Sequence, residues 1–486
     1  MMLMTLAIIL LPLLAGLVLM VARPHVQARS IALLTSLLCL GLAIAMYAGY
    51  DRNSGMLIAY AHDWVPAWGM RIVFGFDGIS LLMVLLTAIV FPFIVGAGWK
   101  QQLSNPSLVN ALILFTQSSL FGVFLAQNAF LFYVFYELAL VPVFFLLIYW
   151  GGERRRAITL KFFIYTVLGG LTLLFGLVYS YLQLPEPRSA DISALQAVTI
   201  APDVQRWLFW VLFIAFAIKM PMFPFHSWQP DTYTMAPLQG TMILGGVMLK
   251  MGLYGVVRFV LPIVPDGVAH WRDVVIALSL VGCLYAGWIA FRQRDLKRLV
   301  AWSSLSHVGL MCAALFVGNT AGITGSLYQT LAHAIIVVAL LYLVGGLKER
   351  IGTTELAAMG GLKVKAPRLA ALFLLVMLGS IALPLTQGFV GEWLMFNGLL
   401  EVSPWWTFLG VISIVLGAIY MLYAYQRSML GEDRWKMEIA DADGIDHWVL
   451  VPLIAATFII GVYPQPVLDL LDAPVQQLLT LINTAH

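Results

Sequence analysis

The chain has 486 residues, of which 61% are hydrophobic and only 10% are charged. Soluble globular domains carry about 25% charged residues, so this composition excludes an ordinary soluble protein and predicts a polytopic membrane protein. The formal net charge of +3 is too small to indicate a nucleic-acid partner.

Fourteen stretches of the chain are long and apolar enough to be membrane-spanning helices, each of which needs about 20 residues. The first lacks the basic leader and small-residue cleavage site of a signal peptide. We therefore expect an all-α fold with residues 1–486 in a single integral membrane domain. The predicted spans are 2–22, 30–50, 77–98, 108–126, 128–150, 161–184, 206–226, 235–262, 273–291, 298–318, 322–347, 367–400, 405–426 and 447–470.

Two of these spans contain proline and are predicted to be broken. Pro221 and Pro224 follow Lys219 in the seventh, and Pro384 divides the overlong twelfth. Such breaks persist in a membrane only where protein or water satisfies the freed carbonyls. The broken spans lie five spans apart, an odd offset that inverts topology. Two inverted five-helix repeats are therefore expected, at 108–262 and 273–426.

The loops that follow odd-numbered spans hold 19 of the 27 Lys and Arg residues, Arg434 and Lys436 among them. The loops after even-numbered spans hold six, and Arg258 is assigned to one of these. Because cytoplasmic loops are enriched in Lys and Arg, we expect both termini on the outer side of the membrane.

Ionisable residues inside predicted spans are the strongest functional signal in the chain. Lys219, Lys250, Glu137 and Glu392 all lie in apolar stretches. A charge at the bilayer centre costs roughly 2.5–3.5 kcal/mol or more, so it persists where it faces a partner, water or an ion path. A buried lysine–glutamate pair titrates as a coupled unit, and this coupling suits proton transfer.

Each of these residues also has a purely structural explanation. Glu137 would be a neutral glutamate bonded to neighbouring backbone, Lys219 would extend to the membrane interface, and Lys250 would pair with a glutamate to pack helices. Glu392 would be an interfacial glutamate beside the break at Pro384.

Two histidines are further candidates for a hydrated path. His307 follows Ser303, Ser304 and Ser306, and His333 follows Tyr328, Gln329 and Thr330 on the next predicted span. Either histidine could instead be a satisfied structural residue.

Three other polar residues are expected at span ends. Asp77 is predicted to be the N-cap of the third span. His226 and Asp231, at the exit of the seventh span, fit loop stabilisation at least as well as proton uptake.

Cofactor signals are missing from the sequence. Cys39, Cys283 and Cys312 form no CxxC pair, and no metal-ligand pattern, P-loop or dinucleotide fingerprint is found. Energy for ion movement is therefore expected from an ion gradient or from partner subunits.

Four segments carry a resemblance to a known family. They are KMPMFPFHSWQPDTYTMAPLQGTMILGGVMLKMGLYGVVRF, RQRDLKRLVAWSSLSHVGLM, FYVFYELALVPVFFLLIYWGG and LPLTQGFVGEW. These resemble, in turn, helices 7–8, the helix 9–10 junction, helix 5 and broken helix 12 of the antiporter-like subunits of respiratory complex I.

The resemblance implies roles for individual residues. It makes Glu137 and Lys219 the central pair, continues the proton path through Lys250, His307 and His333, and ends it at Glu392. Most members have lysine at the Glu392 position, and glutamate there is typical of the group called subunit M, related to mitochondrial subunit 4.

The resemblance also implies partners and cofactors. The chain would be a non-redox, proton-translocating subunit of NADH–quinone oxidoreductase in a bacterial plasma membrane, beside antiporter-like subunits L and N. FMN and iron–sulfur clusters would lie in partner subunits, and this chain would bind no cofactor. Two alternatives remain: a subunit of a multi-subunit cation/proton antiporter or membrane-bound hydrogenase, and a passive scaffold whose charges only pack helices.

Overall fold

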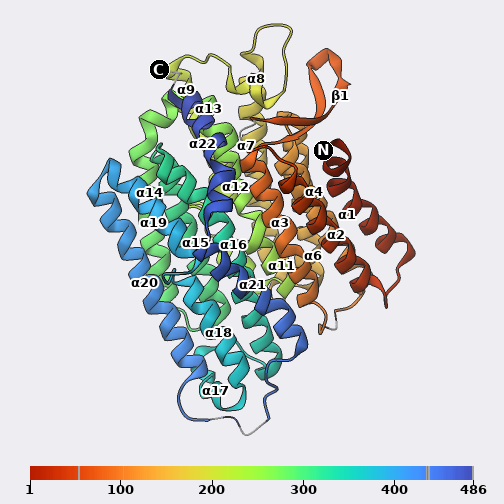
Figure 1. Cartoon of the computed structure of the whole chain (residues 1–486), viewed down its shortest axis with the longest axis vertical. Coiled ribbons are helices and arrows are strands. Elements are labelled where there is room, and N and C mark those ends of the chain that lie inside the picture. Colours follow the sequence, from red (N-terminus) through yellow and green to blue (C-terminus); the bar gives the residue numbers. More distant parts are fainter. Residues whose placement is uncertain (53–54, 102, 434, 436–437, 484–486) are drawn as a thin grey trace.

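A computed structural model describes residues 1–52, 55–101, 103–433, 435 and 438–483. In these residues the chain is a bundle of long helices, with a two-stranded antiparallel hairpin at one end (Figure 1). The predicted all-α membrane fold is confirmed. Arg434 and Lys436, which were counted toward the predicted orientation, lie outside the described residues.

The element order follows the predicted spans closely. The helices that correspond to single spans are α1 (Met2–Ala22), α2 (Ala28–Ala48), α3 (Gly78–Ala97), α4 (Pro106–Leu125), α7 (Arg155–Leu182), α14 (Pro265–Arg292), α15 (Leu296–Phe316), α16 (Thr320–Ile351), α20 (Pro404–Met429) and α21 (Gly444–Val462).

The remaining spans are built from several pieces. They are α5 (Ala129–Leu138) with α6 (Leu140–Trp150); α9 (Pro202–Lys219) with α10 (Gln229–Met235); α11 (Leu238–Ile243), η2 (Leu244–Met248), α12 (Lys250–Gly255), η3 (Val256–Val260) and α13 (Leu261–Ile263); and α18 (Pro367–Ser380) with α19 (Gln387–Val402).

Shorter elements connect the spans. They are β1 (Leu57–Val65), η1 (Pro66–Trp68), β2 (Met70–Phe76), α8 (Ile192–Gln196), η4 (Leu356–Ala358) and α17 (Leu362–Lys365), with α22 (Gln465–Asn483) at the C-terminal end. The hairpin pairs Leu57 with Phe76 and Val65 with Met70. It was not predicted, because β1 mixes polar and apolar residues without a regular period.

Twelve helical segments in the described part of the chain are long and apolar enough to cross a membrane. The predicted seventh and twelfth spans are not among them, because the 18 residues of α9 include Asp203, Arg206 and Lys219, and the twelfth is divided into α18 and α19. The total of fourteen spans and the two repeats stay predictions.

Two details of the expected topology are wrong. The fourteenth span does not reach residue 470, because α21 ends before Pro464 and the separate helix α22 packs on α3 and α16. Arg258 is not in a loop: it lies buried within η3, where Asp77 compensates its charge.

The centre of the bundle consists of α3, α4, α15, α16 and the α11–α13 span. The apolar windows of these spans are 83% to 100% buried, against about a third in α1, α2 and α20. The central helices therefore contact protein on all sides, and polar side chains on them can find partners instead of lipid.

Candidate functional site

Lys219 is the last residue of α9, at the break that Pro221 and Pro224 cause. Its side chain is only 4% exposed, and the ammonium nitrogen lies 4.5 Å from the centroid of the Tyr136 ring. The indole of Trp228 donates a hydrogen bond to the Ile218 carbonyl at 3.0 Å. At the break, a hydrogen bond from a side chain therefore takes the place of a helical one at the Ile218 carbonyl, and the Lys219 ammonium lies over an aromatic ring.

Glu137 lies in the last turn of α5, three residues before α6 begins. It is partly buried against α7, where a Cβ placed on Gly170 would come within 1.9 Å of its Oε1 atom. In the described part of the chain Glu137 and Lys219 form no ion pair within 4.0 Å, although their charges interact electrostatically. Glu137 and Lys219 are therefore close enough for their charges to interact but do not form a direct ion pair in this structure.

Lys250 is fully buried at the start of α12, directly after the π-helical segment η2. Its ammonium nitrogen donates to the Gly245 carbonyl at 2.5 Å and lies 2.9 Å from Nδ1 of His333. A π-helical turn leaves carbonyls in an altered register, and such turns are frequent at functional sites. Here the altered register supplies an acceptor for a buried ammonium.

The row of ionisable residues continues from Lys250 through three further helices. The rings of His333 on α16 and His307 on α15 have centroids 5.6 Å apart. Nδ1 of His307 lies 3.4 Å from Oε1 of Glu392 on α19. The structure therefore brings Lys250, His333, His307 and Glu392 into one contiguous row, while Lys219 and Glu137 form a separate group.

A small cavity adjoins this row. Its volume of about 20 Å³ is enough for about one water molecule. Its lining includes Ser304, His307, Gln329 and His333. Ser304 Oγ, Gln329 Oε1 and Glu392 Oε2 are buried and have no hydrogen-bond partner among the described residues. Buried polar atoms are normally satisfied by protein or ordered water, so this region suits water.

Glu392 is positioned by the break between α18 and α19. Ala382 and Leu385 in that break have φ angles of 53° and 80°, in the left-handed region. A Cβ on Gly391 would come within 2.3 Å of Gln329 Oε1, so this glycine allows α19 to approach α16 closely.

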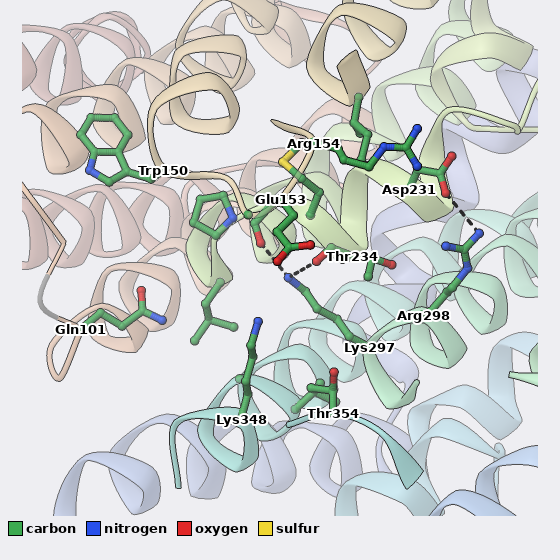
Figure 2. A pocket seen from close by; sticks show the side chains of 18 of the residues that line it. Gln101, Trp150, Glu153, Arg154, Asp231, Thr234, Lys297, Arg298, Lys348 and Thr354 are labelled. Atoms are coloured by element: carbon green, nitrogen blue, oxygen red, sulfur yellow. Dashed lines mark hydrogen bonds and ion pairs between the residues drawn. The ribbon is translucent and has the colours of Figure 1, made fainter. Parts of the chain in front are cut away.

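At the end of the bundle opposite the hairpin, a cavity of about 1140 Å³ opens between the two predicted repeats (Figure 2). Figure 2 shows Lys297 at its centre, where the ammonium donates to the carbonyls of Ala236 at 2.7 Å and Thr234 at 3.2 Å. The wall includes Met235–Leu238, where the span that carries Lys250 begins.

Asp231 and His226 have partners in this region. Asp231 lines the cavity and forms an ion pair with Arg298 at 3.1 Å (Figure 2). It also pairs with Lys161 at 3.5 Å. The ring of His226 packs against Tyr285 and Trp302. These contacts favour loop stabilisation for both residues. Asp77, as predicted, caps α3 by accepting a hydrogen bond from the Ser80 backbone.

The sequence did not lead us to expect a role in the helix bundle for three of its buried polar residues. Tyr136 was not considered, Gln329 was named only as a neighbour of His333, and Arg258 was assigned to a loop. Gln329 had a signal, because it precedes His333 by four residues and so shares its helix face. Tyr136 had none, since only the tertiary fold brings α5 to α9.

No group of three or more His, Cys, Asp or Glu in the described ranges is arranged to hold a metal ion. The chemistry available is that of amines, imidazoles and carboxylates exchanging protons. A membrane bundle with two broken helices and a buried Lys–His–His–Glu row defines an antiporter-like, ion-translocating class of protein.

Comparison with known proteins identifies the family within this class. Residues 126–417 match the model described as "NADH:quinone oxidoreductase/Mrp antiporter, TM", and the chain belongs to this family.

Individual relatives agree. The chain is 36% identical over 462 residues to NADH-quinone oxidoreductase subunit M of Rickettsia bellii, covering 94% of this chain and 92% of that protein. It is 34% identical over 465 residues to subunit M of Rhodobacter capsulatus, covering 93% and 90%. A chain of respiratory complex I from Thermus thermophilus with bound NADH superposes with a TM-score of 0.89 at 29% identity, covering 98% and 99%. The predicted resemblance to subunit M is confirmed.

Proposed function

We propose that this chain is a proton-translocating membrane-arm subunit of an NADH–quinone oxidoreductase. NADH oxidation and quinone reduction take place in partner subunits, which hold FMN and iron–sulfur clusters, while this chain moves protons and binds no redox group. Support comes from the relatives named as subunit M and from the similar chain in a respiratory complex I.

The observation that carries the proposal is the contiguous row from Lys250 to Glu392. Each neighbour in the row lies within reach of a proton transfer made directly or through one water molecule. A proton that arrives on one member changes the electrostatic cost of charging the next, because neighbouring members lie only a few ångströms apart in a buried region. The passive-scaffold alternative leaves this arrangement unexplained, since apolar side chains would pack such helices at no loss of stability.

The proposed path begins at the end of the bundle opposite the hairpin. Protons from the cytoplasm reach Lys219, whose proton affinity is set by the distance of Glu137, and then pass to Lys250. The two lysine-bearing segments are in close contact, since a Cβ on Gly252 would come within 2.8 Å of the Met220 nitrogen. Protons continue through His333 and His307 to Glu392 and leave on the other side.

The proposal includes location and neighbours. The subunit spans a bacterial inner membrane with both termini on the outer side, and antiporter-like subunits L and N adjoin it. In the structure Met1 lies beside Gly49, and Tyr47 donates a hydrogen bond to Pro466 at the start of α22. Both ends of the described chain therefore lie near the hairpin end of the bundle (Figure 1).

Lysine substitutions test the function directly. Lys219→Ala and Lys250→Met are each expected to slow proton pumping about 100-fold or more, the range that general acid–base groups contribute, while the assembly remains intact. The measurements are the initial rate of NADH-driven proton pumping and the number of protons translocated per NADH oxidised, both in membrane vesicles. Lys363→Met, at an exposed position in α17, is the matched control. A normal proton-to-electron ratio in both site variants would overturn the proposal.

A sodium/proton antiporter is the second candidate, because the matched family description includes Mrp antiporters. Purification of the chain with its partners from native membranes distinguishes the two. An assembly with NADH–quinone activity and with flavin and iron–sulfur spectra supports the proposal. A colourless assembly that exchanges sodium for protons in vesicles supports the antiporter.

A further inference from the structure

Arg258 and Asp77 form a buried ion pair near the hairpin end of the helical span that carries Lys250. The guanidinium contacts both carboxylate oxygens, one of them at 2.7 Å, and also donates to Ser80 Oγ at 3.0 Å. Arg258 is 8% exposed and Asp77 is 4% exposed. A charged pair at this depth requires an explanation, because apolar residues of similar volume are often equally stable.

A cavity of about 340 Å³ leads toward this pair from beneath the β1–β2 hairpin. Its lining includes Arg71, Gln127, Asp191 and, at the buried side, Arg258. The Nε atom of Arg258 is buried and has no hydrogen-bond partner among the described residues. Polar side chains and sufficient volume make this a place where water can reach the guanidinium.

Hydroxyl groups occupy the space on the inner side of the pair. Tyr254 lies four residues after Lys250 in α12 and four before Arg258, whose guanidinium carbon lies 5.2 Å from the centroid of the Tyr254 ring. The Tyr254 hydroxyl lies 2.9 Å from Ser80 Oγ and donates to the Phe124 carbonyl at 3.1 Å. Hydroxyls and water can relay protons, and this row would connect Lys250 to the hairpin-end cavity.

We propose that Arg258, held in place by Asp77, is an electrostatic seal that stops protons from the hairpin end from reaching Lys250 along its own helix. Although Asp77 balances its charge, the guanidinium stays protonated and carries only donors, so it cannot accept a proton and pass it on, and fixed positive groups likewise exclude protons in pores. The proposal rests on the proton path proposed above, because a seal is needed only if Lys250 carries protons during turnover. With this route closed, protons on Lys250 leave through His333.

Asp77 already has a structural task without Arg258, as the N-cap of α3 through Ser80. A purely structural pair and a seal therefore predict different results. If the pair only stabilises the fold, any variant that assembles has the same low proton leak as the wild type. If Arg258 seals the route, loss of its positive charge makes an assembled protein leak.

The test is passive proton leak, measured without NADH in vesicles that contain the purified assembly under an imposed pH gradient. Arg258→Gln combined with Asp77→Asn keeps hydrogen-bonding groups but removes both charges. This variant is expected to leak about tenfold faster, which corresponds to a barrier lowered by about 1.4 kcal/mol. Arg258→Lys keeps the charge and is expected to stay near the wild-type rate.

Three further variants complete the design. Arg206→Gln with Asp203→Asn neutralises an exposed ion pair on α9 and is the matched control. Lys250→Met added to the leaking variant is expected to abolish the leak. Arg258→Met with Asp77→Ser retains a capping hydroxyl and replaces the first pair if that pair does not assemble.

If the assembled variant without both charges leaks protons no faster than the wild type, the proposed seal is wrong. Because leak is measured without turnover, this result is separate from a failure of the proton-pumping proposal, which the proton-to-NADH ratio of Lys250→Met decides. A leak that persists when Lys250 is replaced would also reject the proposed route.

Discussion

At the scale of single residues, the question is how an ammonium group is tolerated at a helix break inside the membrane. Lys219 lies over the ring of Tyr136 and has no ion pair within 4.0 Å among the described residues. An aromatic face attracts a cation by about 0.5–2 kcal/mol, less than a direct carboxylate contact in the same surroundings. A moderate attraction of this kind lets Lys219 exchange partners during a transport cycle.

Replacement of Tyr136 tests this role. Tyr136→Leu removes the ring and is expected to slow proton pumping about fivefold to tenfold, the factor that corresponds to a lost cation–π contact of about 1–1.4 kcal/mol. Tyr136→Phe keeps the ring and is the control, expected to stay near the wild type. The measurement is the initial pumping rate in vesicles at matched assembly levels. Equal losses in both variants would assign the effect to the hydroxyl instead.

At the scale of elements, interruptions of helices create the site. The α9 break gives the Ile218 carbonyl to the indole of Trp228, the η2 segment offers an acceptor to Lys250, and the helix after the α18–α19 break brings Glu392 to His307 on α15. Each interruption disturbs main-chain hydrogen bonds, and this is tolerated in a membrane only inside protein or beside water. The polar groups of the site and the irregular backbone therefore depend on each other.

The contact between α5 and α7 offers a test at this scale. Gly170→Ala would place a methyl group 1.9 Å from Oε1 of Glu137, so the carboxylate must move. We expect slower pumping with little loss of assembly, because the strain falls on one side chain of a partly exposed glutamate. Gly41→Ala in α2, where nothing lies within 4 Å of the new methyl group, is the matched control. Unchanged pumping in Gly170→Ala would show that the observed position of Glu137 is not required.

At the scale of the whole molecule, a cluster of charges ties the C-terminal helices to the rest of the bundle. Lys100, before α4, pairs with Asp443 and lies 3.4 Å from Asp446, and Arg350 at the end of α16 also pairs with Asp446. Tyr342 donates to Asp446 at 2.8 Å. The cluster joins the first helices, α16 and α21 at the end opposite the hairpin.

This cluster predicts a dependence of stability on pH. Partial burial raises the pKa of Asp443, but hydrogen bonds from Lys100 and from backbone amides lower it to about 2, against an ordinary value of 3.8. Because the folded state has the lower pKa, this stabilisation is present above about pH 4 and is lost as the pH falls toward 2. The side chain is 50% exposed, so solvent screening keeps the contribution small.

Asp443→Asn is expected to flatten the decline in unfolding temperature between pH 4 and pH 2, because asparagine caps α21 equally well but does not titrate. The measurement is a thermal melt of the detergent-solubilised assembly across this range. Asp203→Asn, which removes one carboxylate of an exposed pair, is expected to leave the decline unchanged. A decline that is identical in Asp443→Asn and the wild type would contradict the prediction.

Much of the architecture follows from local sequence properties. Apolar stretches of about 20 residues must become helices in a bilayer, because only helical segments satisfy their own backbone there. For the same reason the prolines after Lys219 and at position 384 predicted the breaks that the structure contains. The predicted helix ends are wrong where local signals conflict. At Pro464, for example, an apolar stretch continues across two separate helices.

The sequence alone therefore determined the membrane class, most helix positions and most of the intramembrane ionisable residues, because burial in lipid imposes rules on each segment separately. Only the tertiary structure decided which of those residues meet. It joined Lys250, His333, His307 and Glu392 in one row, held Lys219 on Tyr136 apart from Glu137, and moved Arg258 from an expected loop to a buried pair with Asp77. These contacts depend on the packing of helices far apart in the chain, and no single segment encodes them.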